Sequence, residues 1–208
     1  MKEVTELVFI LDRSGSMFDL VKSTINGFNK MLAKQKKLKG KAYVTTILFN
    51  DRIKVLYEDK SIKKVKKMKR EDFQVSGMTA LLDTVGLAIN KTIVKEKKQK
   101  SDHVIFVIMS DGYENASKEY SYSQIKKLIA RQQEKYGWEF IFLGARINAC
   151  HQASKIGIDI NHSITFYEDD AGVEVSFEAM NDYLSNSRKN TFDPSWSNKV
   201  REDYQRKR

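Results

Sequence analysis

Continuous apolar runs alternate with amphipathic stripes along most of the chain. The runs predict buried strands at 7–11, 43–49, 104–109 and 138–143. Apolar positions at helical spacing lie between and after these runs, and they predict helices that begin near Asp19, after Thr79, at Ser121 and at Asn148. Strands that alternate with helices are typical of an α/β fold, a doubly wound, mostly parallel sheet with helices on both faces.

The sequence also predicts the two edge strands of this sheet and the structure of the C-terminal segment. A turn at 50–51 leads into an alternating segment at 53–57, which predicts one antiparallel edge strand, and 164–166 closes the sheet on the other side. A last helical stripe at 173–184 can lie on the domain, so we expect one domain at 1–187. Residues 188–208 are charged and predict a partly mobile tail. Its aromatic residues Phe192 and Trp196 either dock on the domain, the favoured reading, or form a partner-binding strip.

Oxygen-bearing side chains follow two of the predicted strands. Asp12, Ser14 and Ser16 come directly after the first strand, and Asp111 comes after the strand at 104–109. Thr79 stands where a turn leads into a helix. In an open α/β sheet, ligands gather beyond the carboxyl ends of the strands, and oxygen-only donors suit a hard cation. Each residue alone is more simply explained as a helix cap or a turn residue, but their joint occurrence favours a metal site.

The ordered set of Asp12-x-Ser14-x-Ser16, Thr79 and Asp111-Gly112 closely resembles the von Willebrand factor type A domain. In that family these positions form the metal-ion-dependent adhesion site. The resemblance covers roughly residues 3–167 and implies the strand order 3-2-1-4-5-6 with the strands that end in Asp12 and Asp111 side by side. One departure is Met78, where many relatives carry a second Gly.

The resemblance also implies a role for each of these residues. Ser14 and Ser16 would be direct ligands of Mg²⁺ or Mn²⁺, Thr79 a direct or water-bridged one, and Asp12 and Asp111 mainly holders of metal-bound water. Such domains bind a partner protein whose Asp or Glu side chain completes the coordination. No general base or nucleophile with an identifiable partner accompanies the motif, so we expect a binding module and no enzyme.

Length and composition agree with one intracellular domain. The chain has 208 residues, 41% of them hydrophobic, and no apolar stretch near the roughly 20 residues that span a bilayer. The first residues run straight into the first strand, so we expect neither a cleaved signal nor an anchor. The single cysteine, Cys150, fits a reducing compartment, and we expect a cytoplasmic protein similar to the small single-domain versions in bacteria and phages. Cys150 itself is expected to be a buried residue of a helix.

The net charge of +10 is concentrated in three lysine-rich stretches, 34–41, 60–70 and 95–100, which should gather at the edge of the sheet opposite the metal. The simpler reading is solvated surface. The alternative is a basic scaffold that attracts nucleic acid or another polyanion weakly and nonspecifically, with a vestigial metal site. No aromatic residues suited to base stacking are interleaved with these lysines, so sequence-specific recognition is not expected.

Overall fold

The computed structural model describes residues 3–145 and 148–208, and its core is one six-stranded sheet. The strand order is β3-β2-β1-β4-β5-β6, and only β3 is antiparallel to its neighbour. The strands are β1 Val4–Asp12, β2 Lys41–Phe49, β3 Ile53–Ser61, β4 His103–Ser110, β5 Glu139–Gly144 and β6 Ser163–Thr165. Both the expected fold class and the expected strand order are confirmed.

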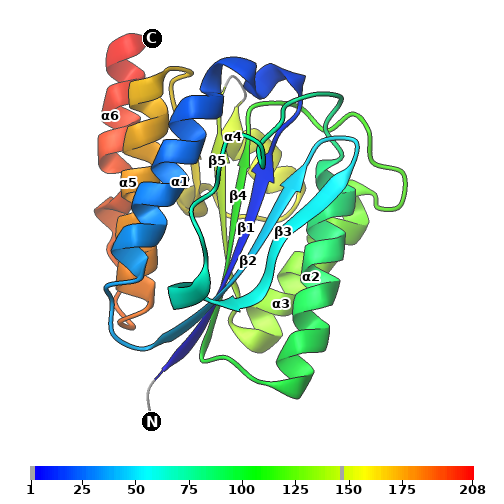
Figure 1. Cartoon of the computed structure of the whole chain (residues 1–208). Helices are drawn as coiled ribbons and strands as arrows, with labels where there is room; N and C mark the ends of the chain where they lie inside the picture. The colour runs from blue at the N-terminus through cyan, green and yellow to red at the C-terminus, as the bar shows by residue number, and fades with distance from the viewer. Residues whose placement is uncertain (1–2, 146–147) are drawn as a thin grey trace.

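Helices cover both faces of this sheet (Figure 1). The α-helices are α1 Val21–Gln35, α2 Leu81–Lys98, α3 Tyr122–Tyr136, α4 Ala149–Lys155, α5 Asp170–Ser187 and α6 Asn198–Lys207. Short 3-10 helices are η1 Gly15–Leu20, η2 Ile62–Lys64, η3 Ile160–His162 and η4 Pro194–Ser197. Helices α1, α5 and α6 pack on one face, and α2, α3 and α4 pack on the other.

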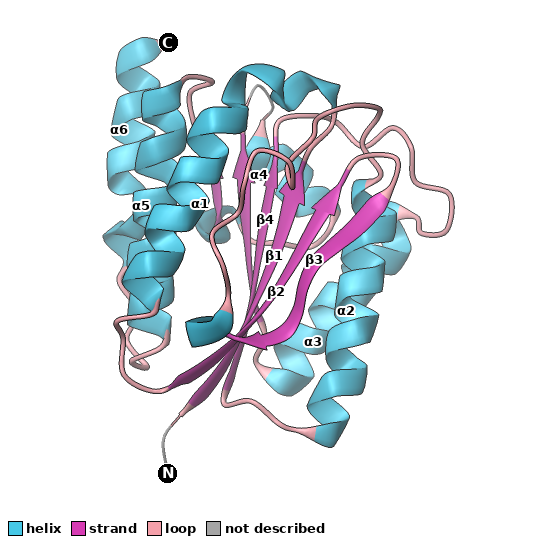
Figure 2. Cartoon of the chain, in the orientation of Figure 1, coloured by secondary structure: helices cyan, strands magenta, loops and turns pink. Residues whose placement is uncertain are grey.

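Two apolar cores follow from the alternation of side chains along the buried strands. In β1, Leu7, Phe9 and Leu11 join the core under α1 and α5, whereas Val8 and Ile10 join the core under α2 and α3. Figure 2 shows the sheet between these two helical layers. A strand covered on both faces reads as a continuous apolar run, which is why the central strands were predictable.

The parallel register brings the carboxyl ends of the central strands to one edge. Asp12 pairs with Phe49 at the ends of β1 and β2, and Ser110 pairs with Gly144 at the ends of β4 and β5. The loops that follow these strands therefore emerge side by side at the top of Figure 1.

Helix α3 begins at Ser121, as the sequence predicts, and both of its ends are capped. Ser121 and Gln124 form a capping box at the start of α3, in which each side chain accepts the other's backbone N–H. Gly137 ends the same helix with φ 66°, the left-handed conformation that favours glycine. Helix α1 begins at Val21, near Asp19 as expected, and η1 occupies the residues directly before it.

The last residues form more regular structure than the sequence indicates. Segment 188–208 contains η4 and the helix α6, which was not predicted. Trp196 is buried and its ring lies 5.0 Å from the ring of Tyr183, so it docks on its own domain. Phe192 is 62% exposed. A helix as polar as α6 buries little apolar surface besides Val200, which explains why no helical stripe was visible.

The lysine-rich stretches lie mainly at the opposite edge of the sheet. Lys41 pairs with Val4 at the start of β1, and the stretch 95–100 directly precedes β4. The stretch 60–70 begins at this edge and then crosses the α1 face, where the backbone N–H of Met68 donates to Asn29 Oδ1 at 2.8 Å. In the part of the chain that the structure describes, no helix is long and apolar enough to cross a membrane.

Several of these lysines are neutralised within the protein. Lys95 Nζ lies 3.0 Å from both Glu6 Oε2 and Glu96 Oε1, and its side chain is only 14% exposed. Burial raises the pKa of Glu6, and the nearby ammonium of Lys95 opposes that shift. In the stretch 60–70, Lys69 Nζ likewise lies 3.0 Å from Glu71 Oε1. The free positive charge at this edge is therefore smaller than the sequence suggests.

Candidate metal centre

The five predicted metal-site residues meet at the carboxyl edge of the sheet. Asp12 ends β1, and Ser14 and Ser16 follow it in the turn that leads into η1. Asp111 follows the last residue of β4, and Thr79 lies two residues before α2. All except the half-buried Ser16 are buried, with exposed fractions of 3% or less.

Hydrogen bonds join the loop after β1 to the end of β4. The hydroxyl oxygens of Ser14 and Ser16 lie 3.2 Å apart, and Ser16 Oγ donates to Asp111 Oδ1 at 2.6 Å. Three oxygen-bearing side chains from two neighbouring strands therefore share one small volume.

Gly112 shows that Thr79 belongs to the same group of oxygens. A Cβ atom placed on Gly112 would lie 3.0 Å from Thr79 Oγ1, 3.6 Å from Ser16 Oγ and 3.9 Å from Ser14 Oγ. The three hydroxyls thus converge on the space beside the Cα of Gly112. A side chain at this position would occupy that space, so glycine keeps it open.

Asp12 has both carboxylate oxygens engaged. Oδ1 accepts the backbone N–H of Ser14 at 2.7 Å, and Oδ2 accepts the hydroxyl of Ser110 at 2.5 Å. Burial raises the pKa of Asp12 to about 6, and the charge of Asp111 adds to the shift, while the bonds from Ser110 and Ser14 oppose it. Asp12 therefore fixes the turn that carries Ser14.

Ser110, the residue that holds Asp12 from β4, was missed in the sequence because a serine at a strand end has no distinctive spacing.

The simpler explanations as helix caps do not apply here. Ser14 precedes η1 but its side chain makes no capping bond, and the capping position of α1 is Leu20. The capping position of α2 is Ala80, so Thr79 does not cap that helix. The structure leaves these side chains directed into the shared cluster instead.

Backbone pairing fixes the turn after β1 against the loop that carries Thr79. The N–H of Gly15 donates to Gly77 O at 3.1 Å, and the N–H of Ser76 donates to Arg13 O at 3.0 Å. Gly77 has φ 71° and an added Cβ would lie 2.0 Å from Asp51 Oδ1, so glycine is required there. Gly15 does not have a positive φ, so the turn after β1 does not require the left-handed backbone conformation that favours glycine.

Met78 adopts an ordinary backbone conformation. It is not among the non-glycine residues with positive φ, so the loop accommodates methionine where many relatives have a second glycine. Its side chain is 55% exposed.

The polar loop after Gly112 is anchored to the start of α2. Asn115 Oδ1 accepts the N–H of Thr79 at 2.8 Å, and Glu114 Oε2 accepts the N–H of Leu82 at 2.9 Å. Asp83 in turn accepts backbone N–H groups of this loop, including that of Lys118 at 2.7 Å. These acidic and amide side chains were missed in the sequence, where they read as ordinary loop and helix-start residues.

The cluster fits a small divalent cation. Magnesium takes six oxygens at about 2.1 Å, which places neighbouring ligand oxygens about 3 Å apart. The separation of 3.2 Å between the Ser14 and Ser16 hydroxyls matches this spacing. Among the residues at 3–145 and 148–208, no three His, Cys, Asp or Glu side chains gather as a metal-binding group. The direct protein ligands would therefore be mainly neutral hydroxyls, as the motif predicts.

Cys150 lies on α4, as expected, but it is half-buried and not fully buried.

Comparison with known proteins places this geometry in a family. The model of the von Willebrand factor type A domain matches residues 6–180. No curated protein sequence matches the chain.

Solved structures share the fold at low sequence identity. A structure of proximal thread matrix protein 1 from the mussel byssus, with a zinc-occupied MIDAS motif, is 14% identical with a TM-score of 0.64, and the match covers 88% of this chain and 46% of that one. A von Willebrand factor type A protein from Catenulispora acidiphila is 14% identical with a TM-score of 0.59 over 89% of this chain and 43% of that one. The vWF domain of the type V pilus tip protein Mfa5 from Porphyromonas gingivalis is 10% identical with a TM-score of 0.65. That match covers 88% of this chain and 96% of that one. This chain thus spans less than half the length of the first two proteins.

Proposed function

This chain belongs to the von Willebrand factor type A domain family, and we propose that it is a Mg²⁺-dependent protein-binding module. The bound partner would supply an Asp or Glu side chain that completes the coordination of the metal. Mn²⁺, which prefers similar oxygen ligands, would substitute for Mg²⁺.

The five clustered residues would have different roles in binding the cation. Ser14 and Ser16 would be direct ligands, Thr79 a direct or water-bridged one, and Asp12 and Asp111 would hold metal-bound water. When bound, the cation supplies a positive charge that neutral hydroxyls leave largely uncompensated, and so an affinity for an external carboxylate. Asp12 is already fixed by Ser110 and by the N–H of Ser14, so it orients the turn rather than reaching outward.

The observation that carries this proposal is the convergence of three hydroxyls beside Gly112. Thr79, Ser16 and Ser14 come from two separate loops, yet all lie within 4 Å of one point beside the Gly112 Cα. The bond from Ser16 to Asp111 then connects the same group to a carboxylate. A structural role as caps or turns would not require these oxygens to face one another.

We propose a binding role without catalysis. The described neighbours of the cluster supply serine hydroxyls, backbone amides and the side chains of Glu114 and Asn115, which are engaged with the backbone of α2 and the loop before it. The serine hydroxyls that donate to carboxylates, Ser16 to Asp111 and Ser110 to Asp12, belong to the proposed metal site itself, so we assign them no catalytic role. We also place the protein in the cytoplasm, because its single cysteine suits a reducing compartment.

The alternative, a polyanion-binding scaffold, has weaker support. Its lysine-rich stretches include Lys95 and Lys69, which pair with acidic residues of the same chain. Binding to phosphates weakens steeply with added salt and is unchanged by a chelator. Binding through a bridging metal is instead lost with EDTA at constant ionic strength.

The test is affinity capture from native lysate in Mg²⁺ and in EDTA, with mass spectrometry of the difference. We expect a protein that is retained only in Mg²⁺, that is not retained by the Ser14→Ala variant, and that is released when one of its own Asp or Glu residues is changed to the amide. A captured protein that is retained equally in EDTA and by the Ser14→Ala variant would contradict the proposal.

A further inference from the structure

Exposed apolar side chains gather around the candidate metal centre. Eight large hydrophobic residues are exposed among those that the structure describes. Three of them lie within two residues of a predicted metal-site residue: Phe18, Met78 and Tyr113, which are 67%, 55% and 56% exposed. We call these three residues the apolar rim.

Each residue of the apolar rim comes from a different loop of the site. Phe18 lies in η1 after Ser16, Met78 directly precedes Thr79, and Tyr113 directly follows Gly112. The hydroxyls of Ser14, Ser16 and Thr79 lie within 4 Å of one point beside Gly112, so the three loops that carry the rim residues meet at the same small area. These loops lie together at the top of Figure 1.

The rim is not simply the exposed remainder of the core. In η1, Met17 and Leu20 are 1% exposed, so the helix already buries its apolar side chains on one face and presents Phe18 on the other. Ile53, 38% exposed, pairs with Phe49 at the same edge of the sheet and extends the apolar surface. The remaining exposed hydrophobic residues are one each on separate elements or connections: Val94, Tyr136, Ile160 and Phe192.

The charges beside the rim are mixed. Asp51 is exposed next to Gly77, and its carboxylate interacts with the guanidinium of Arg13. With the proposed cation bound, the surface would combine a carboxylate-seeking centre with an apolar surround.

We propose that the partner presents one Asp or Glu flanked by large aliphatic or aromatic residues, whose side chains cover Phe18, Met78 and Tyr113. This inference rests on the proposed function, since the acidic side chain is the one that completes the metal site. Burial of the flanking residues against the rim supplies affinity, while the carboxylate supplies metal dependence.

The test uses a displayed library of random linear peptides, selected on the full chain in Mn²⁺ and eluted with EDTA. We expect enriched peptides that carry a single Asp or Glu with large apolar neighbours. Binding of the best synthetic peptide is then measured for Phe18→Ser, Met78→Ser and Tyr113→Ser. We expect each to weaken peptide binding by about tenfold, which corresponds to about 1.4 kcal/mol. The affinity for Mn²⁺ alone, measured by calorimetry, should not change.

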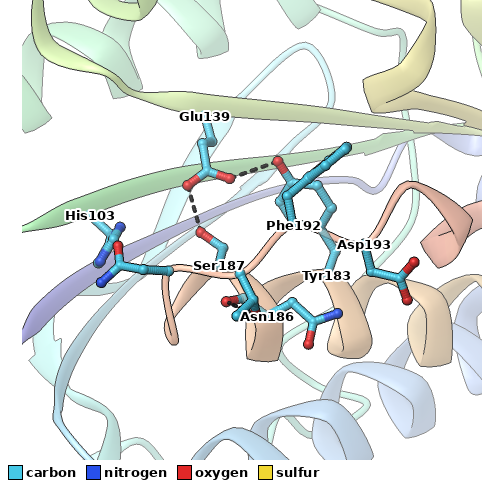
Figure 3. Close-up of a pocket in the computed structure, with 9 residues that line it drawn as sticks. His103, Glu139, Tyr183, Asn186, Ser187, Phe192 and Asp193 are labelled. Atoms are coloured by element: carbon cyan, nitrogen blue, oxygen red, sulfur yellow. Dashed lines mark hydrogen bonds between the residues drawn. The ribbon is translucent and has the colours of Figure 1, made fainter.

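Phe192→Ser is the matched control. Phe192 is as exposed as Phe18, but it lines a cavity of about 210 Å³ at the opposite edge of the sheet, near His103 and Glu139, the first residues of β4 and β5 (Figure 3). Both oxygens of Glu139 there accept hydroxyl bonds, from Tyr183 at 2.7 Å and from Ser187. Peptide binding should be unaffected by this substitution.

The outcomes separate the two proposals. Acidic peptides with polar neighbours, or peptide binding that is unchanged in all three rim variants, would overturn the apolar rim and leave the metal-dependent function standing. If no acidic peptide is enriched in an EDTA-sensitive way, both the proposed function and this inference fail.

Discussion

Gly112→Ala offers the sharpest test of the metal centre, because it adds one methyl group at the point on which the hydroxyls converge. The new Cβ would lie 3.0 Å from Thr79 Oγ1, closer than normal van der Waals contact. Gly112 does not have a positive φ, so alanine fits its backbone conformation. The variant should therefore fold, with Thr79 rotated or displaced by a few tenths of an ångström. An off-rotamer side chain costs about 1 kcal/mol.

The loss should appear in the metal-dependent part of the stability. A ligand that binds only the folded state at 100 times its Kd stabilises it by about 2.7 kcal/mol. For a domain of this size 1 kcal/mol shifts Tm by about 2–4 °C, so Mg²⁺ should raise the Tm of the parent protein by about 5–11 °C. Gly112→Ala should abolish most of this rise while lowering the metal-free Tm by only about 2–4 °C.

Gly15→Ala is the matched control in the adjoining loop. Its added Cβ would meet only Gly77 O, at an ordinary distance of 3.6 Å, so the rise in Tm with Mg²⁺ should be retained. Differential scanning calorimetry with and without Mg²⁺ measures both variants. A Gly112→Ala protein whose Tm rises as much as that of the parent would refute the convergence of hydroxyls on one cation.

Four further substitutions probe the same edge and a site away from it. Ser14→Ala and Asp111→Ala should each abolish the rise in Tm with Mg²⁺, and equal shifts in variant and parent would exclude these residues as metal-site residues. Ser110→Ala removes the hydroxyl bonded to buried Asp12 at 2.5 Å and should lower the free energy of unfolding by about 1–3 kcal/mol in chemical denaturation; an unchanged value would mean that this bond is not needed. Ser121→Ala removes the capping box of α3 and should lower the free energy of unfolding by about 1 kcal/mol with no effect on Mg²⁺ binding, so a lost Mg²⁺ response would contradict the separation of the two sites.

The sheet could be predicted because its strands are covered on both faces. The run from Leu7 to Leu11 contributes to two cores, and such runs leave no ambiguity about burial. The capping box at Ser121 and the glycine at 137 were equally predictable, because their chemistry is local in sequence. Helix α6 was missed because its only clearly apolar buried residue is Val200.

The residues of the candidate site could be predicted from the sequence, but the hydrogen bonds that hold them in place could not. Asp12, Ser14, Ser16, Thr79 and Asp111 follow from the motif, and the structure brings them together. Their supporting contacts join residues far apart along the chain, as in the bond from Ser110 to Asp12, and such pairings leave no periodicity in the sequence.

Whether the metal binds at these residues stays a prediction, as does the division of the chain at residue 187.

The anchoring of the loop at 112–120 to the first turn of α2 has a mechanical consequence. Asn115, Glu114 and Asp83 bond across this junction, so the loop and the helix start behave as a single body. A force applied to Thr79 by a bound protein would be transmitted along the axis of α2. At the other end of this helix, the ammonium of Lys95 forms a salt bridge with Glu6 of the central strand β1. Tension at one end of the domain would thus pass along α2 to the sheet.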